Sequence, residues 1–106
     1  MIIVTTNDLP GYKVTSVVGL ARGITVRSRS IIGNLGGAIQ SIFGGNISVY
    51  TNLAEQARSE ALSLLTSDAQ KMGANAIIAM RYDANEIMDG ITEVLAYGTA
   101  VVVEKA

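Results

Sequence analysis

Short stretches of alternating hydrophobicity predict β-structure in the first half of the chain. Residues 2–6 (IIVTT) are β-branched and predict a short strand, which the turn residues NDLPG then close. Residues 12–26 carry apolar side chains on both phases of an alternating pattern, which predicts a second strand, bent at Gly19 or Gly23. Residues 49–51 (VYT) predict a further short extended piece before the pattern changes to a helical one.

The clearest element is a long helix from Asn52 to Met72. Asn52 is a suitable N-cap, Glu55 completes the pattern of a capping box, and Gly73 provides a C-terminal stop. One side of this helix is apolar and built mainly of alanine, and it comprises Ala54, Ala57, Ala61, Leu62, Leu65, Ala69 and Met72. Such small side chains allow the helix to lie close against a sheet.

Residues 75–104 predict two strands joined by a tight turn at Asp89-Gly90. If those two residues form the loop, Met88 faces Ile91 and the register of the hairpin follows. The predicted pairs are Glu86 with Glu93, Tyr82 with Tyr97, Arg81 with Gly98, Met80 with Thr99 and Ile78 with Val101. The whole chain, residues 1–106, then forms a single α+β domain in which the helix packs on a small antiparallel or mixed sheet.

Composition excludes several classes of function. The chain of 106 residues contains no cysteine and no histidine, so it has no disulfide, no thiolate nucleophile, no histidine base and neither a thiol nor an imidazole ligand for a soft metal. A net charge of −1 argues against a nucleic-acid-binding protein, since phosphate binding needs a concentrated basic surface. Only 16% of the residues are charged, against about 25% in typical domains. This predicts that other subunits cover part of the surface.

Charge is distributed unevenly between the two halves. Residues 1–50 carry a net charge of +3, and residues 51–106 carry −4. These charges either meet within the folded monomer or join a basic patch of one subunit to an acidic patch of the next. The second reading assigns Arg22, Arg27 and Arg29 to an interface with carboxylates of a neighbouring copy.

Residues 30–46 (SIIGNLGGAIQSIFGGN) are rich in glycine and contain no charged residue. They lack the lysine and the spacing of a phosphate-binding loop, and glycine, serine and asparagine interrupt them too often for a bilayer span. Apolar residues nevertheless recur at helical spacing, which favours packing against the same subunit or its neighbour. The predicted interface residues of this segment are Ile32, Leu35, Ile39, Ile42 and Phe43.

Like charges opposite one another in a hairpin repel unless something compensates them, so the predicted pair of Glu86 and Glu93 has two readings. Both carboxylates point into solvent, which is the favoured reading, or together they bind a hard divalent cation through oxygen ligands. A structural role is predicted for Asn52, Arg58, Gly73, Arg81 and Gly98. The N-terminus has no signal-peptide pattern, and we expect a soluble, cytoplasmic protein without stable membrane insertion.

Several motifs in a specific order resemble the YbjQ family of small bacterial and archaeal proteins. They are VTT near the start, Pro10-Gly11, Gly44-Gly45, YTNLAEQAR from Tyr50, GANAII from Gly73, MRYD from Met80 and AYGTAV from Ala96. The resemblance implies a fold similar to the dodecin subunit, a ring-shaped homopentamer and an uncharacterised function labelled as heavy-metal-binding. One departure is Asn46, where the family commonly has glutamate.

Three functional hypotheses follow. The first is a non-enzymatic homo-oligomeric module, pentameric by resemblance, which holds a small ligand between subunits or none; stacking of two rings is left open. The second is a site for a hard divalent cation at Glu86 and Glu93. The third is an enzyme that uses carboxylates and tyrosine in a pocket between subunits, and it has the least support because the sequence offers no nucleophile with a base.

Overall fold

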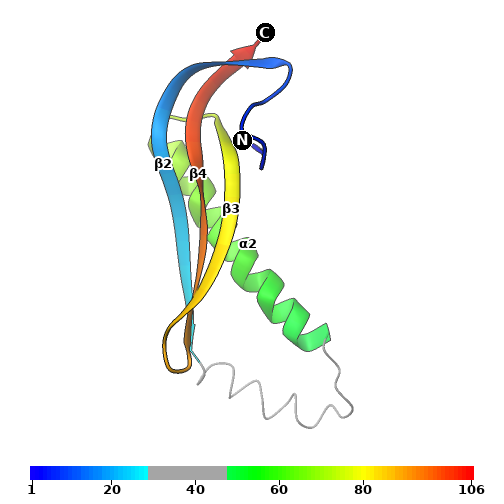
Figure 1. Cartoon of the computed structure of the whole chain (residues 1–106), viewed down its shortest axis with the longest axis vertical. Coiled ribbons are helices and arrows are strands. Elements are labelled where there is room, and N and C mark those ends of the chain that lie inside the picture. Colours follow the sequence, from blue (N-terminus) through cyan, green and yellow to red (C-terminus); the bar gives the residue numbers. More distant parts are fainter. Residues whose placement is uncertain (29–47) are drawn as a thin grey trace.

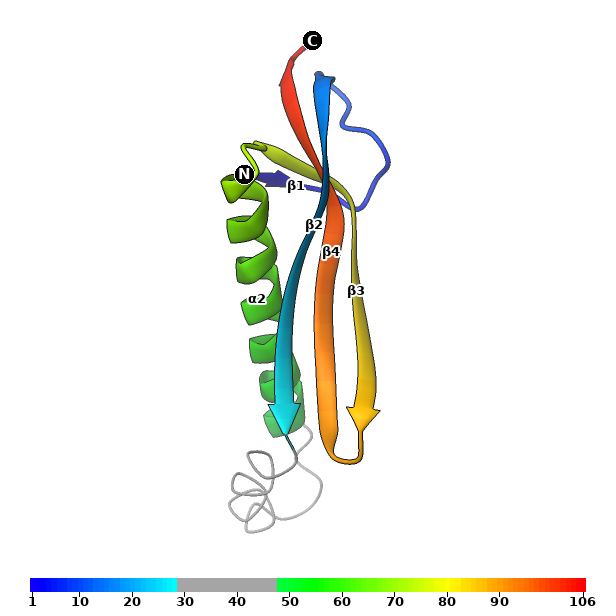
Figure 2. The ribbon, with the colours of Figure 1, turned by 90° about the vertical axis from the view of Figure 1, so that its left-hand side faces the viewer.

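The protein is an α+β domain with a mixed sheet and one packed helix (Figures 1 and 2). The computed structural model describes residues 1–28 and 48–106. Its elements are, in chain order, β1 (Ile2–Ile3), β2 (Tyr12–Ser28), α2 (Ser48–Lys71), β3 (Ala76–Met88) and β4 (Ile91–Lys105). The four-stranded sheet has the order β1-β3-β4-β2, in which only β1 and β3 are parallel. The predicted fold class is therefore confirmed, and among the described residues no helix is long and apolar enough to cross a bilayer.

The predicted first strand is present in a shorter form. Regular pairing with β3 covers β1 alone. The chain nevertheless stays beside β3 a little further, because the Val4 N–H donates to the Ile77 carbonyl at 2.9 Å and the Ala79 N–H donates to the Thr6 carbonyl at 2.8 Å. The N-terminal segment thus covers the first part of the outer edge of β3.

The second strand, β2, is a single long strand with two irregularities. Its register with β4 shifts between Val14 and Ser16 and again between Val17 and Gly19, so the bend predicted at Gly19 is confirmed. Gly23, by contrast, pairs regularly with Ala96. A Cβ at Gly23 would lie 2.3 Å from the Ala61 carbonyl oxygen and the Leu65 amide nitrogen, both in α2. Glycine at this position therefore permits the closest approach between helix and sheet.

The helix begins earlier than its cap pattern predicts. α2 starts at Ser48, so Asn52 lies within the helix rather than at its N-cap, and the extended piece predicted for residues 49–51 was wrong. Residues such as the valine and threonine in this stretch destabilise a helix by only tenths of a kcal/mol each. Extending an existing helix by one turn needs no new nucleation, so the helix continues through them. The predicted C-terminal stop is confirmed, since Gly73 has φ +88° and its N–H donates to the Gln70 carbonyl at 3.0 Å.

The register of the β3–β4 hairpin agrees with the prediction only next to the turn. Met88 does face Ile91, but a shift between Glu86 and Met88 moves the pairing by one residue. A second shift lies between Ile78 and Arg81, where Ala79 adopts φ +53°. The observed pairs are Glu86 with Thr92, Asn85 with Glu93, Tyr82 with Ala96, Arg81 with Tyr97 and Ile78 with Thr99. The predicted register was wrong beyond the turn because bulges add residues to β3 that an ideal hairpin does not have.

The main core lies between α2 and the sheet. The alanine-rich side of the helix faces it as predicted from Ala57 onward, with Ala57, Ala61, Leu65 and Ala69 all buried, whereas Ala54 is exposed because α2 has already diverged from the sheet there. The sheet contributes Ala21, Ile77, Met80, Val94, Ala96 and Ala100. Toward its N-terminus α2 diverges from the sheet, as Figure 1 shows. The other face of the sheet carries no second layer of helices or strands within residues 1–28 and 48–106 (Figure 2). At one end of that face, a smaller cluster buries Ala76, Val101 and Val103 beneath Leu9 and Tyr12.

Two polar side chains, those of Asn75 and Arg81, form hydrogen bonds with the backbone of neighbouring segments. The Asn75 side chain accepts a hydrogen bond from the Val103 N–H at 2.8 Å and donates one to the Val103 carbonyl at 2.9 Å, as a neighbouring strand would. The Arg81 guanidinium donates to the carbonyl oxygens of Thr5 and Met80, at 2.7 and 2.8 Å. Arg81 therefore ties the N-terminal segment to the bulge of β3, which agrees with a structural role.

Candidate functional site

The sheet face that points away from α2, called the open face below, is unusually apolar. In the second half of β2, Ala21 and Thr25 are buried beneath the helix, so the alternate side chains point outward. Leu20, Ile24 and Val26 are exposed on this side by 64%, 43% and 49%. Since a sheet face in contact with water normally carries polar side chains, this row is typical of a surface that a partner covers.

A hollow of about 300 Å³ lies on the open face. Three adjacent strands line it, with Leu20, Arg22 and Ile24 from β2, Glu93, Leu95 and Tyr97 from β4, and Asp83 from β3. Leu95 pairs with Ile24 on one side and with Asp83 on the other, so it forms part of the floor. Among the described residues, no ion pair joins the Arg22 guanidinium to either carboxylate. The hollow therefore combines an apolar floor with charges of both signs that remain available to a partner.

The arginines predicted at an interface have different surroundings. Arg27 forms an ion pair with Glu60 of the same chain and donates to the Thr25 hydroxyl at 2.8 Å. The charges of the two halves thus meet within the monomer at this point. The Arg22 side chain lines the hollow, while its backbone N–H donates to the Asp68 carboxylate in α2 at 3.0 Å. Arg29 lies outside the described residues, as do Ile32, Leu35, Ile39, Ile42 and Phe43.

The ion pair predicts a specific pH dependence. The hydrogen bond from Arg27, together with its charge, lowers the pKa of Glu60 below the ordinary value of 4.5. A carboxyl whose pKa is lowered on folding stabilises the protein above its unfolded-state pKa, and this contribution is lost as the pH falls through the folded-state value. We expect Arg27→Gln to lower the free energy of unfolding at pH 7 and to have a smaller effect at pH 3, as measured by urea denaturation.

Glu55→Gln on the same helix is the matched control for this pair. It removes an exposed carboxylate that forms no ion pair with Arg27, so the difference between pH 7 and pH 3 should stay close to that of the unmodified protein. An Arg27→Gln variant with the same loss of stability at both pH values would show that the ion pair does not contribute.

The two carboxylates predicted to bind a cation are not opposite one another. Glu93 pairs with Asn85, and neighbouring Glu86 points to the other face of the hairpin. The Glu86 carboxylate instead accepts a hydrogen bond from the Gly90 N–H at 2.9 Å and so closes the turn. The described residues contain no group of three or more Asp, Glu, His or Cys side chains that could hold a metal ion. The juxtaposition behind the cation hypothesis is therefore absent.

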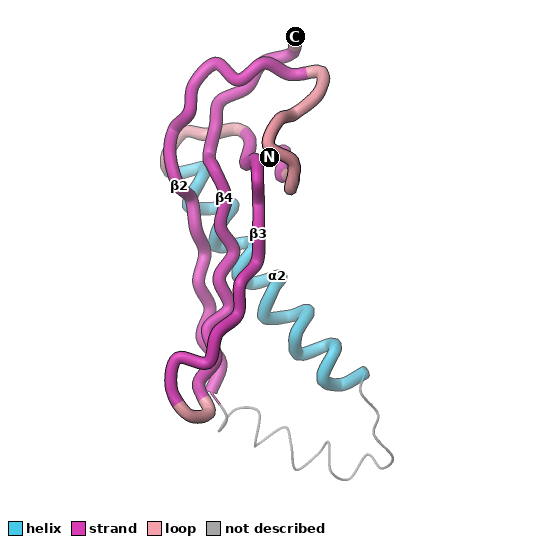
Figure 3. The backbone as a smooth tube through the Cα atoms, in the orientation of Figure 1, coloured by secondary structure: helices cyan, strands magenta, loops and turns pink. Residues whose placement is uncertain are grey.

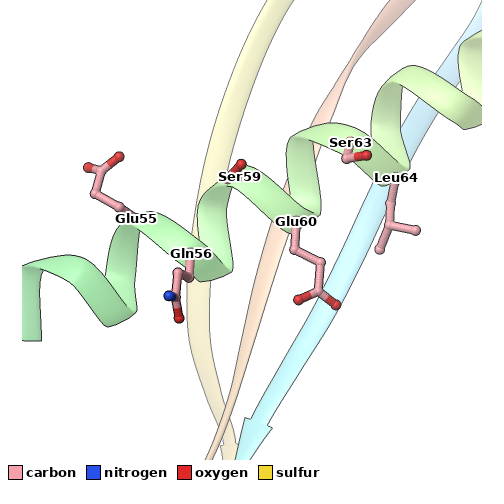
Figure 4. Close-up of a pocket in the computed structure, with 6 residues that line it drawn as sticks. All are labelled: Glu55, Gln56, Ser59, Glu60, Ser63 and Leu64. Atoms are coloured by element: carbon pink, nitrogen blue, oxygen red, sulfur yellow. The ribbon is translucent and has the colours of Figure 1, made fainter.

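A larger hollow, of about 630 Å³, lies along the outer side of α2 (Figure 4). All six of its described lining residues come from this one helix: Glu55, Gln56, Ser59, Glu60, Ser63 and Leu64. Figure 4 shows Gln56, Glu60 and Leu64 pointing to one side and Glu55 pointing away. Without convergent groups from a second element, this surface has less of the character of a binding site than the hollow on the open face.

Sequence reasoning missed Leu20, Ile24 and Leu95 as candidate site residues. The signal was present, because β2 carries apolar side chains on both phases of its alternation, whereas a strand with one wet face carries them on one phase. It also missed Asp68 and Asn75, whose roles depend on backbone groups far away in the sequence.

Arg58 lies over the Tyr82 ring, 5.6 Å from its centroid, and joins α2 to β3.

Comparisons with known proteins show which family the chain belongs to. The sequence model of the YbjQ family, described as "Putative heavy-metal-binding", matches residues 1–104. A UPF0145 protein of Solibacter usitatus is 59% identical over 104 residues, 98% of this chain and 93% of that protein. A UPF0145 protein of Chromobacterium violaceum is 57% identical over 102 residues, 96% of this chain and 87% of that one.

Among solved structures, a protein of unknown function from Pediococcus pentosaceus that belongs to the DUF74 family has the same fold. It matches with a TM-score of 0.64 at 18% identity, and the match covers 98% of each chain. The donor set of the present chain does not fit the family's description, because heavy metals favour thiolate and imidazole ligands and the sequence has neither cysteine nor histidine. The family model nevertheless matches almost the whole chain, and this protein therefore belongs to the YbjQ family.

Proposed function

We propose that the protein is a non-enzymatic module that acts as a closed homo-oligomer, with five subunits as the family resemblance implies. One observation carries the proposal: the sheet buries one face beneath α2 and leaves the apolar part of its second face around Leu20 and Ile24 open. A second copy is the partner that is always present at matching concentration. Nothing in the family description or in the names of the relatives indicates catalysis.

The hollow on the open face gives this module a place for a small ligand between subunits. Its apolar floor at Leu95 would bury the body of the ligand, while Arg22 and the carboxylates of Asp83 and Glu93 would bind polar groups of opposite sign. In a shallow hollow of one subunit such contacts are weak. Coverage by a neighbouring copy would exclude water and strengthen them.

Native mass spectrometry of the untagged protein, purified without chelator, tests the proposal directly. One spectrum reports both the number of subunits and any retained mass. A pentamer without added mass supports an assembly or interaction module, and a pentamer with a stoichiometric adduct supports a ligand between subunits. A monomer at micromolar concentration would contradict the proposal.

Replacing Ile24 by lysine should weaken the oligomer without unfolding the subunit. Ile24 is 43% exposed in the monomer, and burying an unpaired polar group in an interface costs about 1–3 kcal/mol besides the lost apolar contact. We expect the dissociation constant to rise by roughly 10- to 100-fold, measured by analytical ultracentrifugation, with an unchanged circular dichroism spectrum.

Gln70→Lys provides the matched control, because Gln70 is an exposed residue of α2 on the opposite side of the molecule. It adds the same charge away from the open face and should leave the oligomer intact. If both variants assemble as well as the unmodified protein, the open face is not the interface.

A further inference from the structure

The hollow on the open face has its positive and its negative side chains at different ends. Figure 3 shows β4 between β2 and β3. Arg22 pairs with Tyr97, whereas Asp83 pairs with Leu95 one row nearer the turn, and Glu93 lies a further row along β4. With strands about 4.8 Å apart and a rise of about 3.4 Å per residue, the Cα atom of Arg22 lies about 12 Å from that of Asp83 and about 14 Å from that of Glu93.

The surface between these charges is apolar. Leu95 is half-buried and pairs with Ile24, and both side chains line the hollow. They occupy the row that separates Arg22 from Glu93, so a molecule that reached from one charged end to the other would lie across them. The volume of about 300 Å³ is at the lower end of the range for ligand sites, which suits a small molecule.

The charges that line the hollow are not used up within the subunit. Among residues 1–28 and 48–106, no ion pair involves Arg22, Asp83 or Glu93. The remaining stretch, residues 29–47, contains no Asp or Glu with which Arg22 could pair. Arg81 is the other cation of the Arg22 row, and it already donates to two backbone carbonyls. Arg22 is therefore the cation that the hollow offers to an anionic group.

The two carboxylates at the other end are placed to share one cationic group. Asp83 and Glu93 lie on adjacent strands in neighbouring rows, with their Cα atoms about 8 Å apart. The Asn85 side chain donates to the Asp83 carboxylate at 3.2 Å, which orients this carboxylate without neutralising it. Like charges at such diagonal positions repel. An ammonium group has three N–H donors and can donate to both carboxylates at once.

We infer that the hollow binds an extended zwitterion, which is a small molecule with an ammonium group and a carboxylate at opposite ends of an apolar chain. The ammonium group binds Asp83 and Glu93, the chain lies over Leu95 and Ile24, and the carboxylate accepts two parallel hydrogen bonds from the planar Arg22 guanidinium. This inference rests on the proposed function for the presence of a ligand and names its chemical class. An α-amino acid, whose charged groups share one carbon atom, is too short to reach both ends.

A chemical-shift titration of the full chain with 6-aminohexanoate tests the inference, with the backbone amides of Leu95 and Tyr97 as reporters. Its isomer 2-aminohexanoate is the matched control, because it carries the same two charges side by side. Hexylamine and hexanoate each carry one of the two charged ends. We expect 6-aminohexanoate to bind at least about tenfold more tightly than any of the other three, since it alone forms charge-assisted hydrogen bonds at both ends.

Two variants separate the two ends of the site. Arg22→Gln should weaken the binding of 6-aminohexanoate at least about tenfold and leave the binding of hexylamine unchanged. Glu93→Gln should weaken the binding of both by about threefold or more, because both carry the ammonium group. Lys13→Gln and Glu104→Gln are the matched controls, since they remove one charge of each sign from the same two strands outside the hollow. Neither control should change the binding of any probe.

The outcomes distinguish this inference from the proposed function. If 6-aminohexanoate binds no better than its isomer or hexylamine, or if none of the probes shifts the reporter amides, the extended zwitterion is overturned, and an oligomer in native mass spectrometry still supports the module. A monomer that binds 6-aminohexanoate selectively supports the ligand class and contradicts the oligomer, because one subunit supplies the whole hollow. If a variant does not fold, the comparison of the four probes on the unmodified protein decides.

Discussion

Gly23→Ala is expected to destabilise the protein by about 3 kcal/mol or more, because the added methyl group has no space. It would lie 2.3 Å from two backbone atoms of α2, the Ala61 carbonyl oxygen and the Leu65 amide nitrogen. Backbone of a packed helix cannot turn aside as a flexible side chain can, so helix and sheet have to separate. The free energy of unfolding, from urea denaturation followed by circular dichroism, measures this loss.

Gly11→Ala separates this steric effect from the general cost of replacing glycine. Gly11 has φ +86° and nothing within 4 Å of a Cβ, so alanine there meets only the backbone penalty of about 1 kcal/mol. A Gly23→Ala variant that is as stable as Gly11→Ala would show that α2 does not approach β2 so closely.

Leu65→Ala is expected to cost about 3–5 kcal/mol, within the upper range for leucine in a rigid core. Leu65 is fully buried between α2 and the sheet, and its neighbours are mostly alanines, whose short side chains cannot extend into the cavity that remains. The same denaturation experiment measures the effect. With a typical domain stability of about 5–15 kcal/mol, the loss amounts to between about a fifth and the whole of the free energy of unfolding.

The adjacent Leu64 is the control for this substitution. It belongs to the same helix and has the same side chain, but it is 43% exposed and is not part of the core cluster. Leu64→Ala should cost less than about 1 kcal/mol. Equal losses at the two positions would contradict the orientation of α2 on the sheet.

Sequence patterns predicted most of the fold because they act locally. The alanine-rich stripe of the helix, the stop at Gly73 and the turn at Asp89-Gly90 each depend on residues within a few positions of one another. The first turn of α2 was missed because residues 49–51 are of types that favour strands. This preference is small, and extension of the helix overrides it. The bulge at Ala79 was missed because a positive φ is rare for alanine and only its tertiary contacts hold it.

The candidate site was less predictable than the fold because it depends on which side of each strand points outward. A bulge reverses that assignment for every residue beyond it. The shift between Glu86 and Met88 turned the predicted pair of Glu86 and Glu93 into residues of opposite faces and brought Asp83 to the same hollow as Glu93. The apolar open face was the more robust signal, since it follows from the composition of β2 and not from any single register.

The bulges of the β3–β4 hairpin also bear on how chain length can vary among related proteins. Each bulge is a place where one strand contains a residue more than its partner, and the pairing on both sides remains intact. Loss of one residue near Ile87 would remove a bulge and leave the turn at Gly90 in place, whereas loss of one residue within the regular stretch from Tyr82 to Glu86 would exchange the inward and outward side chains on one side of it. Alignment gaps in this hairpin should therefore cluster at the bulges, and a gap elsewhere would be the mark of a misaligned sequence.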